Sequence, residues 1–313
     1  MDRFQGIAGL RICENAPLSE YTRFAIGGPA LILADASTPE AFARALIVAG
    51  ESGLAYTVIG GGSNLLVSDA GFPGVVLRFT GKEITFAGEE IVVEAGAELQ
   101  SLVDASIEHG LRGLETMTGI PGWVGGAIYG NAGAYGHSIH ERVNSVRIFD
   151  GKQMREIGND ECAFRYRESI LKRRKDWIVV SAMLEMETGD PAKLARTAAE
   201  IRKVRDAKYP PTMHCAGSIF KNLLFDELPG TVRTQLPSGV VREGKVPSAY
   251  FLEKAGAKGM TDGAIRVAGY HANLIYNTGG GTAAQVRRLI GELKRRVNAQ
   301  FSIALEEEVQ YVP

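Results

Sequence analysis

The chain has 313 residues, of which 45% are hydrophobic and 23% charged, a composition typical of a globular protein with a substantial core. The formal net charge of −1 gives no general field for nucleic acid or an anionic membrane, so an anionic ligand would need local positive clusters. No apolar run approaches the length of a bilayer-spanning helix, Met1-Asp2-Arg3 does not open a secretory signal, and the three cysteines lack metal-site spacing. We therefore expect a soluble cytoplasmic protein with free thiols.

The first elements along the chain form a small α/β unit. Residues 31–34 are apolar and predict a strand. Thr38 and Pro39 then supply a cap and a first-turn proline for a helix, whose apolar residues at 42, 46 and 49 share one face. Gly50 and Gly53 are expected to end this helix.

The next stretch is dominated by short strands. We predict strands at 75–79, 84–86 and 91–93, then a helix whose apolar face is formed by residues 99–107. A longer strand, 177–186, closes this region. The predicted domains are accordingly 1–188, with subdomains of about 1–73 and 74–188, and 189–313.

Two helices frame the last third of the chain. The first begins at Asp190-Pro191 and runs to about Asp206, with Leu194, Ala198, Ile201 and Val204 predicted to face inward. The second has apolar residues from Val286 to Phe301 at helical spacing and basic residues on its outer face. A final strand is predicted at 302–312. The whole pattern is α+β.

Glycine is over-represented, with 38 of 313 residues, or about 12% against an average near 7%. Gly60-Gly61-Gly62-Ser63-Asn64 lies between two apolar runs, and seven glycines interleaved with apolar residues lie between Gly119 and Gly136. Backbone amides in such turns can line an anion site, because glycine allows positive φ and has no Cβ. Neither stretch has the Rossmann or Walker A spacing, and a glycine-rich loop packed in a core is the alternative interpretation.

The two stretches together carry a family resemblance. GGGSNLLV followed by GIPGWVGGAIYGNAGAYG resembles the flavin-binding signature of bacterial UDP-N-acetylenolpyruvoylglucosamine reductases, and the resemblance extends from Leu18 to Val309. It implies an FAD-binding domain in two parts, of the vanillyl-alcohol-oxidase (PCMH-like) type, followed by a C-terminal α+β substrate-binding domain. It also implies non-covalent FAD with NADPH as hydride donor. The residues implied to bind FAD are Gly60, Gly61, Gly62, Ser63, Asn64, Gly119, Ile120, Pro121, Gly122, Gly125, Gly126, Asn131, Ala132, Gly133 and Tyr166.

The implied reaction is a cytoplasmic step of peptidoglycan precursor synthesis. Hydride passes through FAD to the vinyl carbon of UDP-N-acetylglucosamine enolpyruvate, which develops charge on the neighbouring carboxylate and needs an acid to protonate the α-carbon. Three residues match the family's catalytic positions. Arg167 would hold the carboxylate, Ser218 would deliver the proton, and Glu308 would assist in a protonated or hydrogen-bonded form, while Glu306 and Glu307 are expected to be solvated.

The matches to substrate-side positions are Lys208, Asn222, Lys258 and His271, each of which is a surface or core residue in the alternative interpretation. Leu223 follows Phe-Lys-Asn where the family usually has proline. The sequence of residues 223–246 differs from that usual in the family, so this segment would form an extra lid or a packing segment.

Other interpretations remain open. His137 and His140 suggest a metal only weakly, since no third ligand has suitable spacing, and His137 could in principle bond FAD covalently. Cys215, between His214 and Ser218, could be read as a nucleophile, although no orienting acid is evident. Two other functions are an FAD oxidase of the same fold acting on a small alcohol or hydroxy acid, and a nucleotide-sugar-binding protein without flavin. We expect a monomer with a nucleotide-sugar substrate, no metal, and no nucleic-acid or membrane partner.

Overall fold

The computed structural model describes residues 3–313, so Met1 and Asp2, which entered the prediction about a secretory signal, lie outside the described residues. The chain forms two compact units. The described residues of the first unit are 3–16, 30–62 and 73–207, and the second comprises 17–29, 63–72 and 208–313. Each unit is therefore made of three separate segments of the chain. The predicted domain boundary between residues 188 and 189 stays a prediction. No helix within 3–313 is long and apolar enough to cross a bilayer.

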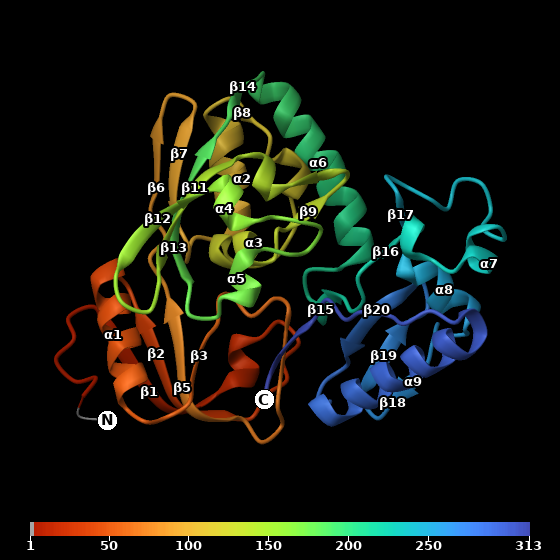
Figure 1. The fold of residues 1–313 in the computed structure, drawn as a ribbon, viewed down its shortest axis with the longest axis horizontal. Coiled ribbons are helices and arrows are strands. Elements are labelled where there is room, and N and C mark those ends of the chain that lie inside the picture. Colours follow the sequence, from red (N-terminus) through yellow and green to blue (C-terminus); the bar gives the residue numbers. More distant parts are fainter. Residues whose placement is uncertain (1–2) are drawn as a thin grey trace. The chain divides into compact units, whose positions relative to one another are not determined.

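A four-stranded sheet and one helix begin the first unit. The strands are β1 (Leu10–Pro17), β2 (Pro29–Ala36), β3 (Tyr56–Val58) and β5 (Phe72–Phe79), in the order β1-β2-β5-β3. Helix α1 (Pro39–Glu51) lies beside this sheet (Figure 1), and Phe42 stacks on Phe79 with ring centroids 5.3 Å apart. The side chain of Thr38 accepts a hydrogen bond from the amide of Ala41, which confirms the predicted cap.

A five-stranded antiparallel sheet forms the rest of the first unit. Its order is β12-β11-β13-β7-β6, with β6 (Ile84–Ala87), β7 (Glu90–Glu94), β11 (Val143–Phe149), β12 (Met154–Gly158) and β13 (Ile178–Glu185). The helices are α2 (Leu99–Glu108), α3 (Val124–Tyr129), α4 (Asn159–Cys162), α5 (Ile170–Arg173) and α6 (Pro191–Lys208), which continues one residue into the second unit. Short pairs are β8 (Leu111–Arg112) with β14 (Glu187–Thr188), and β9 (Gly133–Ala134) with β10 (His137–Ser138). The 3-10 turns are η2 (Glu115–Met117) and η3 (Ile139–Glu141).

The second unit is built on another antiparallel sheet, in the order β15-β20-β19-β18. Its strands are β15 (His214–Ser218), β18 (Thr261–Asp262), β19 (Ile265–Ala268) and β20 (His271–Asn277). Helices α8 (Ser248–Lys254) and α9 (Ala283–Phe301) lie beside it (Figure 1). The remaining elements are η1 (Leu18–Tyr21), β4 (Leu65–Val67), β16 (Leu223–Leu224), η4 (Phe225–Glu227), α7 (Gly230–Arg233), β17 (Lys245–Val246) and β21 (Gln310–Val312).

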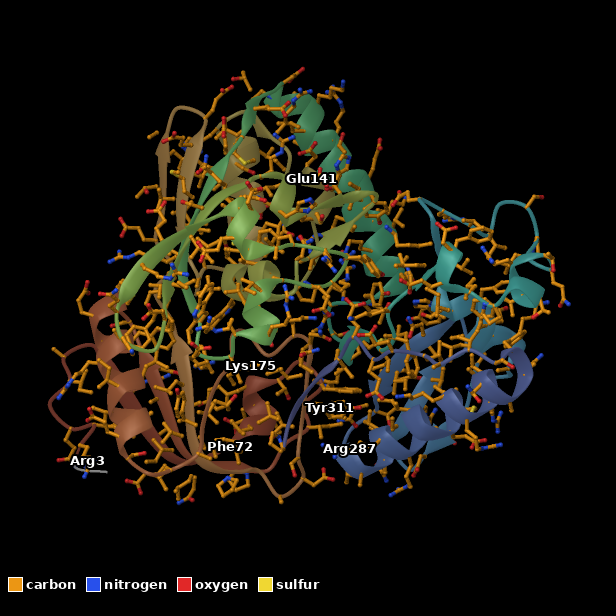
Figure 2. The ribbon with its side chains drawn as sticks, in the orientation of Figure 1. Arg3, Phe72, Glu141, Lys175, Arg287 and Tyr311 are labelled. Atoms are coloured by element: carbon orange, nitrogen blue, oxygen red, sulfur yellow. The ribbon has the colours of Figure 1, made fainter. Side chains whose placement is uncertain are left out.

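Helix α9 is the clearest confirmed prediction. A capping box joins Thr282 and Gln285 at its start, and both carboxylate oxygens of Asp69 accept hydrogen bonds from the amides of Ala283 and Ala284. Farther along α9, the guanidinium of Arg287 lies 4.8 Å from the ring centroid of Tyr311, which belongs to the C-terminal strand β21 (Figure 2). The helix is therefore fixed at its N-terminus and along its exposed side.

Two local predictions are wrong. Val204 of α6 has an exposed fraction of 58%, because the helix buries only Leu194 and Ala198. The final strand covers only 310–312, instead of 302–312. Ser302 takes left-handed backbone geometry as the cap of α9, and such a residue cannot continue as extended strand.

The atypical segment 223–246 contributes to packing. Strands β16 and β17 pair antiparallel at its two ends. Leu228 is buried, and Phe225, Val232 and Leu236 pack partly buried against the core of the second unit. These contacts favour the packing segment of the two predicted roles.

Candidate functional site

A bulge at the end of β15 presents Ser218. Cys215 pairs with Tyr276 and Ser218 with Leu274, so the register of β15 against β20 shifts between these two positions. Gly217 lies in the bulge with a φ of +72°, which favours glycine. Bulges re-aim a side chain out of the regular alternation of a strand, and here the residue after the glycine is Ser218.

The hydroxyl of Ser218 belongs to a short chain of polar groups. Tyr209 Oη lies 2.9 Å from Ser218 Oγ and 3.3 Å from His271 Nε2, and the rings of Tyr209 and His271 meet edge to face. No motif in the sequence marks Tyr209 as a site residue. Its one signal is an aromatic residue between Lys208 and the Pro210-Pro211 break, which by itself indicates no chemistry.

The predicted cations gather around His271. Burial is the largest cause that lowers the pKa of His271 to about 4; the positive charges of Lys208 and Lys258 act in the same direction, and Glu253 opposes them. Lys258 also forms an ion pair of 2.6 Å with Glu253. The second unit therefore brings Lys208, Lys258 and His271 into electrostatic range of one another.

This environment predicts a pH-dependent stability. Between about pH 4 and 6.5 the unfolded chain protonates His271 while the folded chain does not, so the free energy of unfolding falls as the pH falls through that window. His271→Gln should flatten this part of the profile in urea denaturation followed by circular dichroism. His214→Gln, which changes an exposed histidine on β15, should keep the wild-type slope. Equal slopes for wild type and His271→Gln would contradict the prediction.

A buried amide fixes the segment after Ser218. Asn273 accepts a hydrogen bond from the amide of Phe220 (2.9 Å) and donates to the carbonyl of Phe220 and to Ser248 Oγ, both at 2.8 Å. The predicted substrate residue Asn222 accepts a bond of 3.4 Å from the amide of Ser248. No pattern in the sequence indicates this role of Asn273.

Glu308 lies on a segment that pairs with the residues following Ser218. Its amide donates to the carbonyl of Ile219 (2.7 Å), and Phe220 forms a bridge with Glu307. Its carbonyl accepts from the side chain of Asn64 (2.8 Å), while the amide of Gln310 donates to the carbonyl of Asn64 (2.9 Å). One predicted catalytic residue and one predicted flavin-motif residue are thus joined by a direct hydrogen bond, from the Asn64 side chain to the main-chain carbonyl of Glu308.

The neighbouring glutamates are ion-paired. Glu306 pairs with Lys221 at 2.5 Å, and Glu307 pairs with Lys294 at 2.8 Å and accepts a hydrogen bond from Tyr311. The side chain of Glu307 is only 21% exposed, so its predicted solvation is wrong. The ion pair with Lys294 and the Tyr311 hydroxyl replace water around that carboxylate.

In the first unit the two glycine stretches meet at Trp123. A Cβ added at Gly61 would lie 2.9 Å from the Trp123 indole, and one added at Gly60 would lie 3.9 Å from it. At Gly125 an added Cβ would lie 2.8 Å from that of Ala95, so protein packing requires this glycine. Gly126 is exposed, and a Cβ there would meet nothing within 4 Å. This open main chain is suited to close approach by a ligand.

The other predicted flavin residues of the stretch are held by local hydrogen bonds. The amide of Gly119 donates to Gln100, that of Ile120 to Met117, and that of Ala132 to Ala127, while the carbonyl of Gly122 accepts from the amide of Leu99. Pro121 lies between Ile120 and Gly122. A Cβ at Gly133 would lie 2.3 Å from the carbonyl of His137 in the β9–β10 pair, so this glycine too is required by the fold.

Arg167 is held against the same stretch. It has a φ of +56°, within a turn in which Arg165 and Glu168 exchange both main-chain hydrogen bonds. Its guanidinium donates to the carbonyls of Gly133 (2.9 Å) and Asn131 (3.5 Å) and lies 5.3 Å from the ring centroid of Tyr166. The predicted Arg167, Tyr166, Asn131 and Gly133 are therefore neighbours. Left-handed backbone at a non-glycine residue is uncommon and concentrates at functional sites.

Asn131 itself joins the two loops. It is buried, has a φ of +43°, and donates to the carbonyl of Arg165 while accepting from the amide of His140. Asparagine tolerates this left-handed backbone better than most residues, which explains its place in the stretch.

The residues of the alternative metal and nucleophile sites have other surroundings in the structure. His137 contacts Glu141 at 2.8 Å, His140 contacts Ser138 at 2.7 Å, and residues 3–313 hold no cluster of three potential metal ligands. Cys215 is fully buried, as is Cys162, whose thiol pKa burial raises to about 12, and all three cysteines are free thiols. A buried thiol without an activating partner is a poor nucleophile.

Known proteins are similar to this chain along almost its whole length. A family model described as "UDP-N-acetylenolpyruvoylglucosamine reductase, C-terminal domain" matches residues 209–312, and one described as "FAD binding domain" matches 30–153. The chain is 57% identical to the UDP-N-acetylenolpyruvoylglucosamine reductase of Solibacter usitatus, covering 99% of both chains. It is 37% identical to that of Carboxydothermus hydrogenoformans, covering 96% of this chain and 93% of that one.

A solved structure is similar over the same extent. The crystal structure of UDP-N-acetylenolpyruvylglucosamine reductase (MurB) from Thermus caldophilus has a TM-score of 0.76 at 30% identity, covering 97% of this chain and 99% of that one. The matched family model, the relatives and this structure all agree with the resemblance found in the two glycine stretches. The chain belongs to the UDP-N-acetylenolpyruvoylglucosamine reductase family.

Proposed function

We propose that this protein uses NADPH and FAD to reduce UDP-N-acetylglucosamine enolpyruvate to UDP-N-acetylmuramate, in peptidoglycan precursor synthesis. The single observation that supports this most is the presentation of Ser218. A bulge aims it, Tyr209 contacts its hydroxyl at 2.9 Å, and the Glu308 segment pairs with the residues that follow it. This arrangement occurs in a chain 57% identical to a curated reductase.

The residues of the two glycine stretches and Tyr166 fit a flavin. The main chain at Gly126 is exposed, and a Cβ there would meet nothing within 4 Å, so a flat ligand could approach it closely. Gly60, Gly61, Gly62, Ser63 and Asn64, with the stretch 119–133 and Tyr166, would hold the cofactor. When bound, FAD supplies the transfer of hydride from NADPH to a substrate carbon.

The side chains of the protein would supply charge and a proton. Arg167 would attract the substrate carboxylate, because its planar guanidinium is permanently charged and its orientation is fixed by the carbonyl of Gly133. Ser218 would hold the proton at Oγ for the α-carbon. Lys208 and Lys258 would attract diphosphate, and Asn222 and His271 would complete the substrate side as neutral hydrogen-bonding groups. Glu308 would assist from the neighbouring segment, in protonated or hydrogen-bonded form.

An absorbance experiment tests the cofactor and the reaction together. The purified protein should show an oxidised flavin spectrum that NADPH bleaches without oxygen, and UDP-N-acetylglucosamine enolpyruvate should restore it within seconds. Acid precipitation should leave the yellow colour in the supernatant, since the flavin is held without a covalent bond. A colourless supernatant would show covalent attachment, with His137 the first residue to examine.

Two results would contradict the proposed function. Rapid re-oxidation by oxygen, with no effect of the enolpyruvyl substrate, would indicate an oxidase of the same fold. A colourless protein that binds the nucleotide sugar and does not take up added FAD would indicate a binding protein.

We further propose a cytoplasmic monomer whose partner is this small-molecule substrate. The net charge of −1 supports the absence of a nucleic-acid partner. Light scattering coupled to size exclusion would test the oligomeric state against the 33.6 kDa mass of one chain.

A further inference from the structure

We propose that Tyr209 is a positioning and proton-relay residue that supplies the hydroxyl of Ser218 with a replacement proton while Ser218 protonates the substrate. This inference rests on the proposed function, in which Ser218 is the acid. Tyr209 belongs to none of the sets assigned from the resemblance. It lies outside the bulge, just before the Pro210-Pro211 turn.

The contacts around Tyr209 form an ordered series. Its Oη lies between Ser218 Oγ at 2.9 Å and His271 Nε2 at 3.3 Å. The turn that follows is held by Arg23, which donates to the carbonyl of Pro210 at 3.3 Å. The ring of Tyr209 is partly buried against Cys215, Ala268 and Leu274. Packing and hydrogen bonding therefore keep the phenol at the serine.

The proposed direction of proton movement requires one tautomer of His271. With neutral His271 protonated on Nε2, this nitrogen donates to Tyr209 Oη, which leaves the phenolic hydrogen to donate to Ser218 Oγ. The hydrogen of Ser218 is then directed outward from the series. Each donor in such a chain strengthens the next bond.

The relay balances as an acid–base step. The Oγ–H bond of Ser218 breaks as a C–H bond forms at the substrate's α-carbon, using the electron pair of the enolate. The electron pair left on Oγ takes the phenolic proton of Tyr209, and the phenolate takes a proton from water. No oxidant or reductant is needed beyond the hydride transfer of the proposed function.

Tyr209 suits this task better than a second alcohol would. A phenol has an ordinary pKa of about 10 and is a much stronger acid than a serine hydroxyl. The ammonium of Lys208 lies 5.2 Å from the ring centroid of Tyr209, where its charge favours the phenolate. Negative charge is thereby moved from the serine to a delocalised group beside a cation.

Tyr209→Phe in the FAD-loaded full chain tests the relay, because it removes only the hydroxyl. Reduction of FAD by NADPH should stay within about twofold of wild type, while re-oxidation by UDP-N-acetylglucosamine enolpyruvate in single turnover slows about 10- to 100-fold. The loss should fall on kcat, with KM changed by less than about twofold, since Tyr209 acts on the proton in flight.

A proton inventory separates a relay from mere support. Plotted against the deuterium fraction of the solvent, the wild-type single-turnover rate should curve as expected for two moving protons, and that of Tyr209→Phe should be linear. Tyr276→Phe is the matched control, since Tyr276 packs on the same small cluster and has no part in the series. It should behave as wild type in both measurements.

The outcomes are distinct. A Tyr209→Phe rate within about twofold of wild type, or a slow rate with the curved inventory retained, would overturn the relay. Failure of the wild type to consume the enolpyruvyl substrate would instead overturn the proposed function. A changed melting temperature with a linear inventory would still support the relay, because support of the fold does not alter the number of protons in flight.

Discussion

Ser218→Ala should slow re-oxidation of the reduced flavin by UDP-N-acetylglucosamine enolpyruvate by about 100- to 10,000-fold, the range expected for loss of a positioned general acid. The change removes one oxygen and leaves the bulge intact, because Gly217 and the pairing of residue 218 with Leu274 depend on the main chain. Reduction of FAD by NADPH should stay within about twofold of wild type. Stopped-flow absorbance of the two half-reactions measures both rates in one preparation.

A graded series sharpens this test. Ser218→Cys keeps an acidic hydrogen at the same position, so its rate should lie between those of wild type and Ser218→Ala. Thr212→Ala removes an exposed hydroxyl six residues earlier and should have no effect on either half-reaction. Equal slowing of both half-reactions by Ser218→Ala would mean that the serine binds the cofactor or shapes its site instead of supplying the proton.

Arg167→Met should slow the same half-reaction by about 100- to 1,000-fold, comparable to the loss of one donor to a developing anion. Methionine keeps much of the side chain's bulk but not its charge, and it would occupy the left-handed backbone at +56° no more easily than arginine does. Since the backbone strain is shared, a difference between the two proteins reports the guanidinium and its bonds to Gly133 and Asn131. The KM for the enolpyruvyl substrate should rise as well.

Two further substitutions distinguish charge from geometry at this position. Arg167→Lys keeps a positive charge but cannot form the planar fork, so it should recover only part of the lost rate. Arg165→Met changes an exposed arginine in the same turn and should leave catalysis and stability close to wild type. If Arg165→Met and Arg167→Met were equally impaired, the turn would act as a whole and Arg167 would have no individual role.

Local sequence was sufficient to predict much of the fold. The cap at Thr38, the helices α2, α6 and α9, and the strands β5, β6, β7 and β13 follow from short-range periodicity and capping, which depend on residues a few positions apart. Val204 is exposed, against the prediction, because an apolar residue at helical spacing is buried only if another element covers it. The last strand was overestimated because the cap geometry of Ser302 is set by how α9 ends.

Some residues of the candidate site can be predicted from the sequence, and others cannot. Residue type and order are sufficient to identify the glycine stretches, Arg167, Ser218 and Glu308, because a family signature consists of residues close together in the sequence. The sequence did not indicate the roles of Tyr209 and Asn273. The role of Tyr209 depends on its contact with Ser218, and that of Asn273 on its hydrogen bonds to Phe220, which is 53 residues away in the sequence.

The amino-acid sequence by itself determined the helices α1, α2, α6 and α9, several strands, the family and the kinds of side chain available for chemistry, because these depend on neighbours along the chain. Only the tertiary structure decided that Asn64 bonds to Glu308, 244 residues away, and that the bulge of β15 turns Ser218 toward Tyr209. Such contacts depend on strand register and on closing long loops, and a shift of one residue in register would turn each side chain to the opposite face.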